Sequence, residues 1–352
     1  MNEDQDQGGD EALPTGASLQ DAVQRLEARL LDGLPRLTRQ EVADAAGVPL
    51  VVAEEMWRLL GFARVGDDDV AFTDADVEAL RLTHDLMRLG VLDDDSQSAL
   101  VRTWGRSFAR LAEWQTSLMA RVALEDARDP AEQLARFAED VLPRIDQLQS
   151  YVWRRHLTSA AGRLLTSSGG ARDAADAVQT QTVCFVDIVG YTARSRSLDE
   201  SELVAWLEYF EDQCAGMSLD VGARIIKNIG DEVLLVADAP GPMVALALAM
   251  TARGEDEDDR FPRVRAGVAT GEVVSRLGDV FGSTVNVAAR LTSVSRPGRV
   301  LVDAGTHDAL APAEQPAGAD DAPPYRFKRV RRISVKGFTR LAAWTVRPRS
   351  GG

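Results

Sequence analysis

The chain of 352 residues has few cysteines and no long apolar run. Neither of its 2 cysteines, Cys184 and Cys214, stands at a spacing typical of a disulfide framework or a zinc site. No stretch approaches the roughly eighteen consecutive apolar residues of a membrane span. The acidic N-terminus MNEDQDQGGDE lacks the positive region of a signal peptide. We therefore expect a soluble cytoplasmic protein, and leave open peripheral contact with a membrane or lipid.

Basic residues are also scarce. The chain carries 40 Lys and Arg against 55 Asp and Glu, a formal net charge of -15. Most of such a surface repels the phosphate backbone, so we expect no nucleic-acid partner. A hydrophobic content of 45% over 352 residues is enough for two domains with proper cores.

The hydrophobic periodicity changes along the chain and predicts the domain organisation. Residues 1–17 are polar and acidic and predict a disordered tail. Residues 18–150 repeat apolar positions at helical spacing and predict an all-α domain, in which Thr73 and Asp76 form a capping box. Residues 151–178 predict a helical linker that ends in a Ser- and Gly-rich joint. Residues 179–348 alternate β-type runs with helices and predict an α+β domain.

Two segments have a more specific local pattern. The segment LTRQEVADAAGVPLVVAEEMWRLLGF reads as a helix-turn-helix. Its second helix offers two Glu and one Arg, which favours two packed helices over a DNA reader. In the second half, Ser197 and Glu200 predict a capping box for a helix at about 198–216. A strand at 263–269 and a short arm at 272–280 are expected further on.

Asp187 and Asp231 each stand where an apolar run meets a turn, in TVCFVDIVGYT and RIIKNIGDEVLLVA. Two such carboxylates can hold a pair of hard divalent cations, as phosphoryl transfer requires. Asn286 and Arg290 are four residues apart in NVAAR, which places both on one face of a helix. The amide of Asn286 could orient a ribose, and the guanidinium of Arg290 could stabilise the negative charge that develops on a transferring phosphoryl group.

From about 180 to 347 the chain resembles the catalytic domain of class III nucleotidyl cyclases. The matching strings are FVDIVGYT, IIKNIGDEVLL, VRAGVATGEVV, GDVFGSTVNVAARL and SVKGF. The resemblance implies a ferredoxin-like βαββαβ core, a head-to-tail homodimer, and conversion of a nucleoside triphosphate into a cyclic 3′,5′-monophosphate and pyrophosphate. The all-α half resembles the regulatory domains of some actinobacterial cyclases, a few of which respond to pH or lipid.

The resemblance also assigns roles to single residues. It implies that Asp187, Asp231 and the backbone carbonyl of Ile188 bind two Mg²⁺ or Mn²⁺ ions. Asn286 and Arg290 would act on the transition state from the other subunit. Lys227 and Asp279 stand where adenylate cyclases select adenine, which favours ATP because Lys donates to N1 and Asp accepts from the N6 amine. Lys336 in SVKGF resembles a late phosphate-contacting lysine.

Three questions stay open at this point. Glu272 stands where many relatives carry a phosphate-contacting Arg, so part of the triphosphate charge has no assigned partner. His84 and His156 lie in the helical half, and their protonation is one hypothesis for pH sensing. The alternatives to an adenylate cyclase are a guanylate cyclase, which would replace Lys227 and Asp279, and a nucleotide-sensing or DNA-binding regulator.

Overall fold

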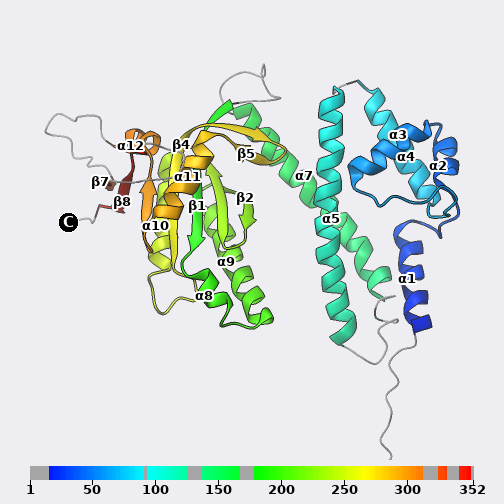
Figure 1. The fold of residues 1–352 in the computed structure, drawn as a ribbon, viewed down its shortest axis with the longest axis horizontal. Coiled ribbons are helices and arrows are strands. Elements are labelled where there is room, and N and C mark those ends of the chain that lie inside the picture. The colour runs from blue at the N-terminus through cyan, green and yellow to red at the C-terminus, as the bar shows by residue number, and fades with distance from the viewer. Residues whose placement is uncertain are drawn as a thin grey trace, which may run out of the picture. The chain divides into compact units, whose positions relative to one another are not determined.

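The computed structural model describes residues 16–90, 93–125, 133, 136–166, 178–311, 324–330 and 341–349. The chain divides into two compact units, Met1–Gly170 and Ala171–Gly352. The described part of unit 1 is helical apart from one isolated bridge, whereas unit 2 is built on a mixed sheet (Figure 1). The expected fold class, an all-α region followed by an α+β domain, is therefore confirmed.

Over its described residues, unit 1 consists of a series of helices. In chain order they are α1 (Gly16–Leu30), α2 (Arg39–Ala46), α3 (Leu50–Leu60), α4 (Asp74–Arg88), α5 (Asp94–Glu125), a π-helical turn (Phe137–Val141) and α7 (Leu142–Thr166). At the start of α4 the backbone N–H of Thr73 donates to Oδ2 of Asp76 at 2.7 Å, as half of the predicted capping box. The Thr73 hydroxyl also donates to the carbonyl of Leu31 at 3.0 Å, so the cap joins α4 to the end of α1.

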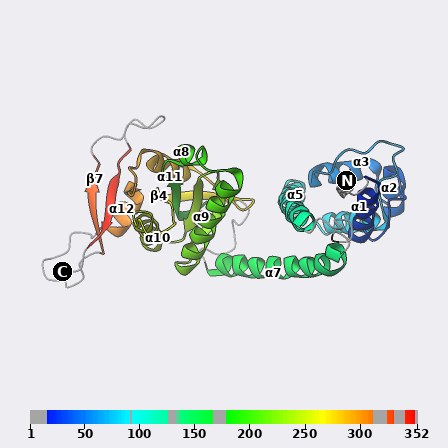
Figure 2. The same ribbon diagram turned by 90° about the horizontal axis from the view of Figure 1, so that it is seen from below.

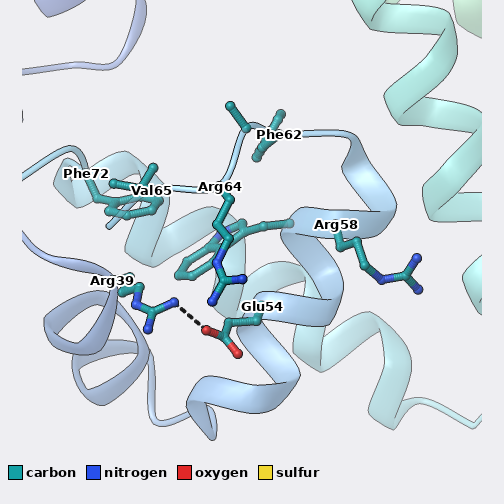
Figure 3. A pocket seen from close by; sticks show the side chains of 9 residues that line it. Arg39, Glu54, Arg58, Phe62, Arg64, Val65 and Phe72 are labelled. Carbon is teal, nitrogen blue, oxygen red and sulfur yellow. Dashed lines mark hydrogen bonds and ion pairs between the residues drawn. The ribbon is translucent and has the colours of Figure 1, made fainter. Parts of the chain in front are cut away.

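Helices α2 and α3 form the helix-turn-helix, and their charges pair within the unit. Gly47 ends α2 in the left-handed conformation at φ 70°, and Nη1 of Arg39 contacts Oε1 of Glu54 on α3 at 2.5 Å. Figure 3 shows this ion pair at the edge of a pocket. The pocket has a volume of about 290 Å³, and Trp57 and Phe72 are among the residues that line it. Their rings stack with centroids 4.8 Å apart. The ion pair therefore holds α2 to α3, and the aromatic stack holds α3 to the segment just before α4.

The described part of unit 2 forms one sheet of eight strands. The strands are β1 (Val178–Ile188), β2 (Arg224–Ile229), β3 (Glu232–Ala237), β4 (Val264–Arg276), β5 (Asp279–Phe281), β6 (Val300–Val302), β7 (Tyr325–Arg329) and β8 (Trp344–Pro348). Their order is β2-β3-β1-β4-β6-β8-β7, with β5 paired to β4. The first four pair antiparallel, and only β4 and β6 are parallel. With the helices α9 (Glu200–Asp220) and α10 (Pro240–Arg253), strands β1 to β4 make the expected ferredoxin-like βαββαβ core.

Helices cover both faces of this sheet. The described helices of unit 2 are α8 (Tyr191–Ser195), α9 (Glu200–Asp220), α10 (Pro240–Arg253), α11 (Ser283–Val294) and α12 (Ala304–Leu310). Figure 2 shows β4 between α10 and α11. Cys184 and Val186 of β1 pack in the core with α9 and α10, whereas Val183 and Phe185 pack toward α11. Because side chains alternate along a strand, Asp187 belongs to the α11 face.

Gly267 allows α11 to lie close to the sheet. A Cβ atom on Gly267 would stand 2.3 Å from the backbone nitrogen of Thr292 and 2.5 Å from the carbonyl oxygen of Ala288. Both atoms belong to α11, so a side chain at this position on β4 would push the helix outward. The absence of a side chain thus sets the depth at which α11 packs.

Two local predictions were wrong. Helix α9 is capped by Asp199 and Glu202, and the Ser197 hydroxyl donates instead to the carbonyl of Arg194 at 2.8 Å. The carboxylate of Asp199 is the stronger cap here because it accepts from the backbone of Glu202 at 2.8 Å and from the Ser201 hydroxyl at 2.7 Å. The expected arm at 272–280 is also not separate from the strand before it.

Strand β4 runs unbroken through Arg276 and pairs back on β5, because Leu277 and Gly278 turn the chain with positive φ angles of 53° and 78°. Two consecutive left-handed residues give the tight hairpin that keeps both strands in register. The arm is therefore the outer half of a long hairpin.

In the part of the chain that the structure describes, no helix is long and apolar enough to cross a membrane.

Candidate active site

A row of charged residues crosses three strands at the end of β1. Asp187 on β1 is the Cα partner of Glu232 on β3 and of Arg265 on β4, so the three side chains share the α11 face of the sheet. Asp187 is only 4% exposed. Nε of Arg265 donates to Oδ2 of Asp187 at 2.5 Å. A buried carboxylate is thus held between a cation and a second acid.

Asp231 stands next to Asp187 because the β2–β3 turn packs on the end of β1. Gly230 makes this turn with φ 64°, and the backbone N–H of Ile188 donates to the carbonyl of Asp231 at 3.1 Å. Burial raises the pKa of the Asp187 carboxyl, the Arg265 guanidinium lowers it, and the negative charge of Asp231 raises it further. The two predicted metal-binding carboxylates therefore lie close enough to repel each other.

Glu232 adds to this negative charge. Burial raises the pKa of the Glu232 carboxyl, and the charges of Asp187 and Asp231 raise it too, whereas Arg265 lowers it. Sequence reasoning missed Glu232 and Arg265, although both stand inside matched strings. Their place beside Asp187 depends on the register between strands, which residue spacing alone does not give.

The donor set fits a divalent cation. Carboxylate and carbonyl oxygens are the ligands that Mg²⁺ and Mn²⁺ prefer, and a cation would relieve the repulsion that raises the Asp187 pKa. Over the described ranges, no group of three or more His, Cys, Asp or Glu residues is arranged to hold a metal. Asp187, Asp231 and the Ile188 carbonyl therefore remain the predicted ligand set, with two carboxylates rather than three.

Lys227 and Asp279 come together from different strands. Nζ of Lys227 on β2 forms an ion pair with Oδ2 of Asp279 on β5, and the two side chains are 42% and 28% exposed. Lys227 is the register partner of Leu234, which packs in the core beneath α11. The pair thus belongs to the same face of the sheet as Asp187, and it offers one cationic donor and one anionic acceptor side by side.

Asn286 and Arg290 lie on the outer side of α11. Thr284, Ala288 and Leu291 of this helix are buried, whereas both predicted transition-state residues are exposed. Among the contacts of the described residues, neither side chain makes a hydrogen bond or an ion pair. The structure therefore joins Asp187 with Asp231 and Lys227 with Asp279, and it leaves the α11 pair free to meet another surface.

The remaining residues singled out from the sequence lie apart from these two pairs or outside the described residues. Lys336 lies outside the described residues. Glu272 is exposed on β4, and its backbone carbonyl accepts from the hydroxyl of Thr284 at 2.7 Å. His84 on α4 is partly exposed and His156 on α7 is exposed. Arg265 is a described cation that contacts one of the predicted metal carboxylates, Asp187.

The chain is similar to known cyclases over most of its length. The adenylate and guanylate cyclase catalytic domain family matches residues 174–347. A protein of Glutamicibacter nicotianae named adenylate cyclase is 38% identical over 84% of this chain and 77% of its own length. A pH-sensitive adenylate cyclase of Mycobacterium tuberculosis is 32% identical over 87% of this chain and 77% of its own.

Among solved structures, the adenylyl cyclase CyaB from P. aeruginosa is 23% identical, with a TM-score of 0.40 over 49% of this chain and 96% of that one. Domains of this family generally use divalent metal ions, which agrees with the oxygen donors at the end of β1. On the family match and the two long sequence relationships, the chain belongs to the class III nucleotidyl cyclases.

Proposed function

We propose that the protein converts ATP into 3′,5′-cyclic AMP and pyrophosphate. The observation that carries this proposal is the ion pair between Lys227 and Asp279. Lysine donates only, which suits the N1 acceptor of adenine, and a carboxylate accepts only, which suits the N6 amine. Guanine presents the opposite pattern, with an N1–H donor and an O6 acceptor. The pair therefore favours ATP over GTP.

Asp187, Asp231 and the carbonyl of Ile188 would hold two divalent ions. When bound, these ions supply positive charge that makes the ribose 3′-hydroxyl more acidic and neutralises the departing pyrophosphate. The positions of the two carboxylates determine where the ions would bind. The β-sheet register holds Asp187, and the tight turn at Gly230 holds Asp231.

Asn286 and Arg290 would act in the site of a second copy of the chain. Their side chains are exposed on α11 and without a bond in the described structure, which supports a role at an interface. Asn286 would orient the ribose, and Arg290 would meet the charge that builds on the transferring phosphorus. A two-fold, head-to-tail homodimer then creates two equivalent sites, and Lys336 would reach the triphosphate in each.

We further propose that residues 18–150 regulate the catalytic domain at 179–348 through the linker at 151–178. A relative named pH-sensitive adenylate cyclase is similar over 87% of this chain, which supports pH as the signal. His84 and His156 are the candidate groups, because histidine changes charge near neutral pH. Replacing both should flatten the pH–activity curve of the full chain, and an unchanged curve would remove them from the mechanism. A lipid signal is the second hypothesis.

One assay separates the functional alternatives. Purified full-length protein is given ATP or GTP, each with Mg²⁺ or Mn²⁺, and the cyclic product and pyrophosphate are measured. We expect cyclic AMP and little cyclic GMP. A preference for GTP would make the protein a guanylate cyclase, and the absence of both products would favour a nucleotide-sensing module.

A further inference from the structure

Strand β2, which carries Lys227, contains a β-bulge. Ile225 pairs with Leu235 of β3. The next paired residue is Lys227, which lies opposite Leu234, so the ladder skips Ile226. Two residues of β2 therefore stand opposite one residue of β3, and such bulges re-aim the side chains that follow them. This bulge lies directly before the lysine that we assign to the purine.

The bulge decides which face of the sheet Lys227 occupies. A regular ladder continued from Ile225 would place Lys227 opposite Val233, because successive residues alternate between the two faces. Val233 packs in the core beneath α9 and α10, whereas Leu234 packs toward α11. The inserted residue thus puts Lys227 on the α11 face, where it forms its ion pair with Asp279.

The two neighbours of Lys227 in the chain face opposite sides of the sheet. Ile226 packs against the buried cluster beneath α11, which contains Leu234. Asn228 pairs with Val233 and therefore faces α9. Lys227 itself is 42% exposed and stands on an edge strand, so its own side chain does little to fix the strand. The position of Lys227 depends on how its neighbours are held.

Glu211 of α9 is the partner of Asn228 on the α9 face. Burial raises the pKa of the Glu211 carboxyl, a hydrogen bond from the Asn228 side chain lowers it, and the charge of Glu208 raises it. A half-buried carboxylate needs such a donor, and Asn228 faces α9 because of the bulge. Loss of the bulge would therefore take this bond from Glu211 and would also move Lys227 away from Asp279.

We propose that the bulge at Ile226 and the contact of Asn228 with Glu211 determine base selection by holding Lys227 on the α11 face. Asn228 and Glu211 are positioning residues, because they act on the substrate only through Lys227. This proposal rests on the proposed function, in which Lys227 and Asp279 recognise adenine. Because the side chain of lysine is long and flexible, its backbone must be fixed if the ammonium group is to meet one ring nitrogen of the base.

Substitutions on the α9 face test this coupling without changing the residues that meet the purine. Asn228→Ala and Glu211→Ala each remove the bond, whereas Glu211→Gln keeps an acceptor for the Asn228 amide. Glu208→Ala is the matched control, because Glu208 is an exposed acid one turn earlier on α9. The full chain is assayed with Mn²⁺ for kcat/KM with ATP and with GTP. Hydrogen exchange of the β2 amides without nucleotide reports on the register of the strand.

We expect Asn228→Ala and Glu211→Ala each to lower the ratio of kcat/KM for ATP to kcat/KM for GTP about fivefold, the effect of one moderate hydrogen bond. The value for GTP should stay nearly constant, and exchange of the β2 amides should become faster. Because both residues act through Lys227, adding Asn228→Ala to Lys227→Met should lower the ratio no further. Glu211→Gln should keep most of the wild-type ratio, and Glu208→Ala should change neither measurement.

A wild-type ratio in both alanine variants would overturn the proposal. Equal losses with ATP and with GTP would also overturn it, since they would assign the contact to folding alone. If Asn228→Ala does not fold, Glu211→Ala decides the result, because it removes the same bond from the other side. A wild-type protein that forms no cyclic AMP would end the proposed function. The exchange measurement would still test the contact in that case, and unchanged exchange in β2 would show that the contact does not hold the bulge.

Discussion

Replacing Lys227 with Met should remove the preference for ATP without unfolding the catalytic unit. The ion pair with Asp279 joins side chains that are 42% and 28% exposed, so solvent screens it strongly. Such a pair contributes about 1 kcal/mol or less to stability. The melting temperature should therefore fall by only a few degrees, by about 2–4 °C for a unit of this size.

The effect on catalysis should be much larger. A hydrogen bond from a charged group contributes about 1.5–3 kcal/mol when its partner is left unpaired. Loss of the bond from Lys227 to adenine N1 should thus lower kcat/KM for ATP about 10- to 100-fold. The value for GTP should change little, because Lys227 offers no acceptor to its N1–H. The ratio of kcat/KM for ATP to kcat/KM for GTP should therefore fall by nearly the same 10- to 100-fold factor.

The assay is the formation of each cyclic nucleotide with Mn²⁺, at substrate concentrations well below KM. Lys328→Met is the matched control, because Lys328 is an exposed lysine on β7. It should leave the ATP/GTP ratio unchanged. If Lys227→Met lowers kcat/KM for ATP and for GTP by the same factor, Lys227 does not select the base. The proposal that Lys227 and Asp279 distinguish the purines is then refuted.

Three further predictions follow from the same site. Asp187→Asn and Asp231→Asn should each abolish cyclic AMP formation while the circular dichroism spectrum stays unchanged; turnover above a hundredth of wild type would show that these acids are not metal ligands. Burial and like charges raise the pKa values of Asp187 and Glu232, so the folded state binds more protons than the unfolded state between their ordinary and raised pKa values. The free energy of unfolding without metal should therefore fall as pH rises through that window. Melting temperatures measured with and without Mn²⁺ should show that the metal opposes this loss. A melting temperature that rises with pH in the absence of metal would contradict the burial of these two carboxylates side by side. Gly267→Ala should lower the melting temperature by about 5 °C or more because its Cβ meets the backbone of α11 at 2.3 Å, whereas Gly216→Ala, which meets nothing within 4 Å, should not lower it.

Sequence patterns predicted the elements of unit 2 better than their ends. The apolar run before Asp187 predicted a strand, and β1 begins at Val178 and ends at Ile188. The box at Ser197 and Glu200 was misplaced by two residues, because Asp199 and Glu202 satisfy the same spacing. Where two polar pairs compete for one helix start, spacing does not decide between them, and the carboxylate wins through its stronger hydrogen bonds.

In the candidate site, too, the sequence predicted single residues but not the contacts between them. Motif order singled out Asp187 and Asp231, yet gave no reason to name Arg265 or Glu232. Both become part of the site only through the register of β4 and β3 against β1. The ion pair of Lys227 with Asp279 likewise needs the hairpin of β4 and β5 to bring the two residues together. Contacts between strands depend on pairing, which a single sequence does not specify.

The central claim is that each site takes its carboxylates from one protomer and Asn286 and Arg290 from the other. The direct test mixes two inactive variants, Asp187→Asn and Arg290→Ala, in equal amounts and measures cyclic AMP formation. Random pairing makes half of the dimers mixed, and each mixed dimer has one intact site, so about a quarter of wild-type activity should return. A mixture that stays as inactive as its parts, although the two variants exchange subunits, would contradict the shared site.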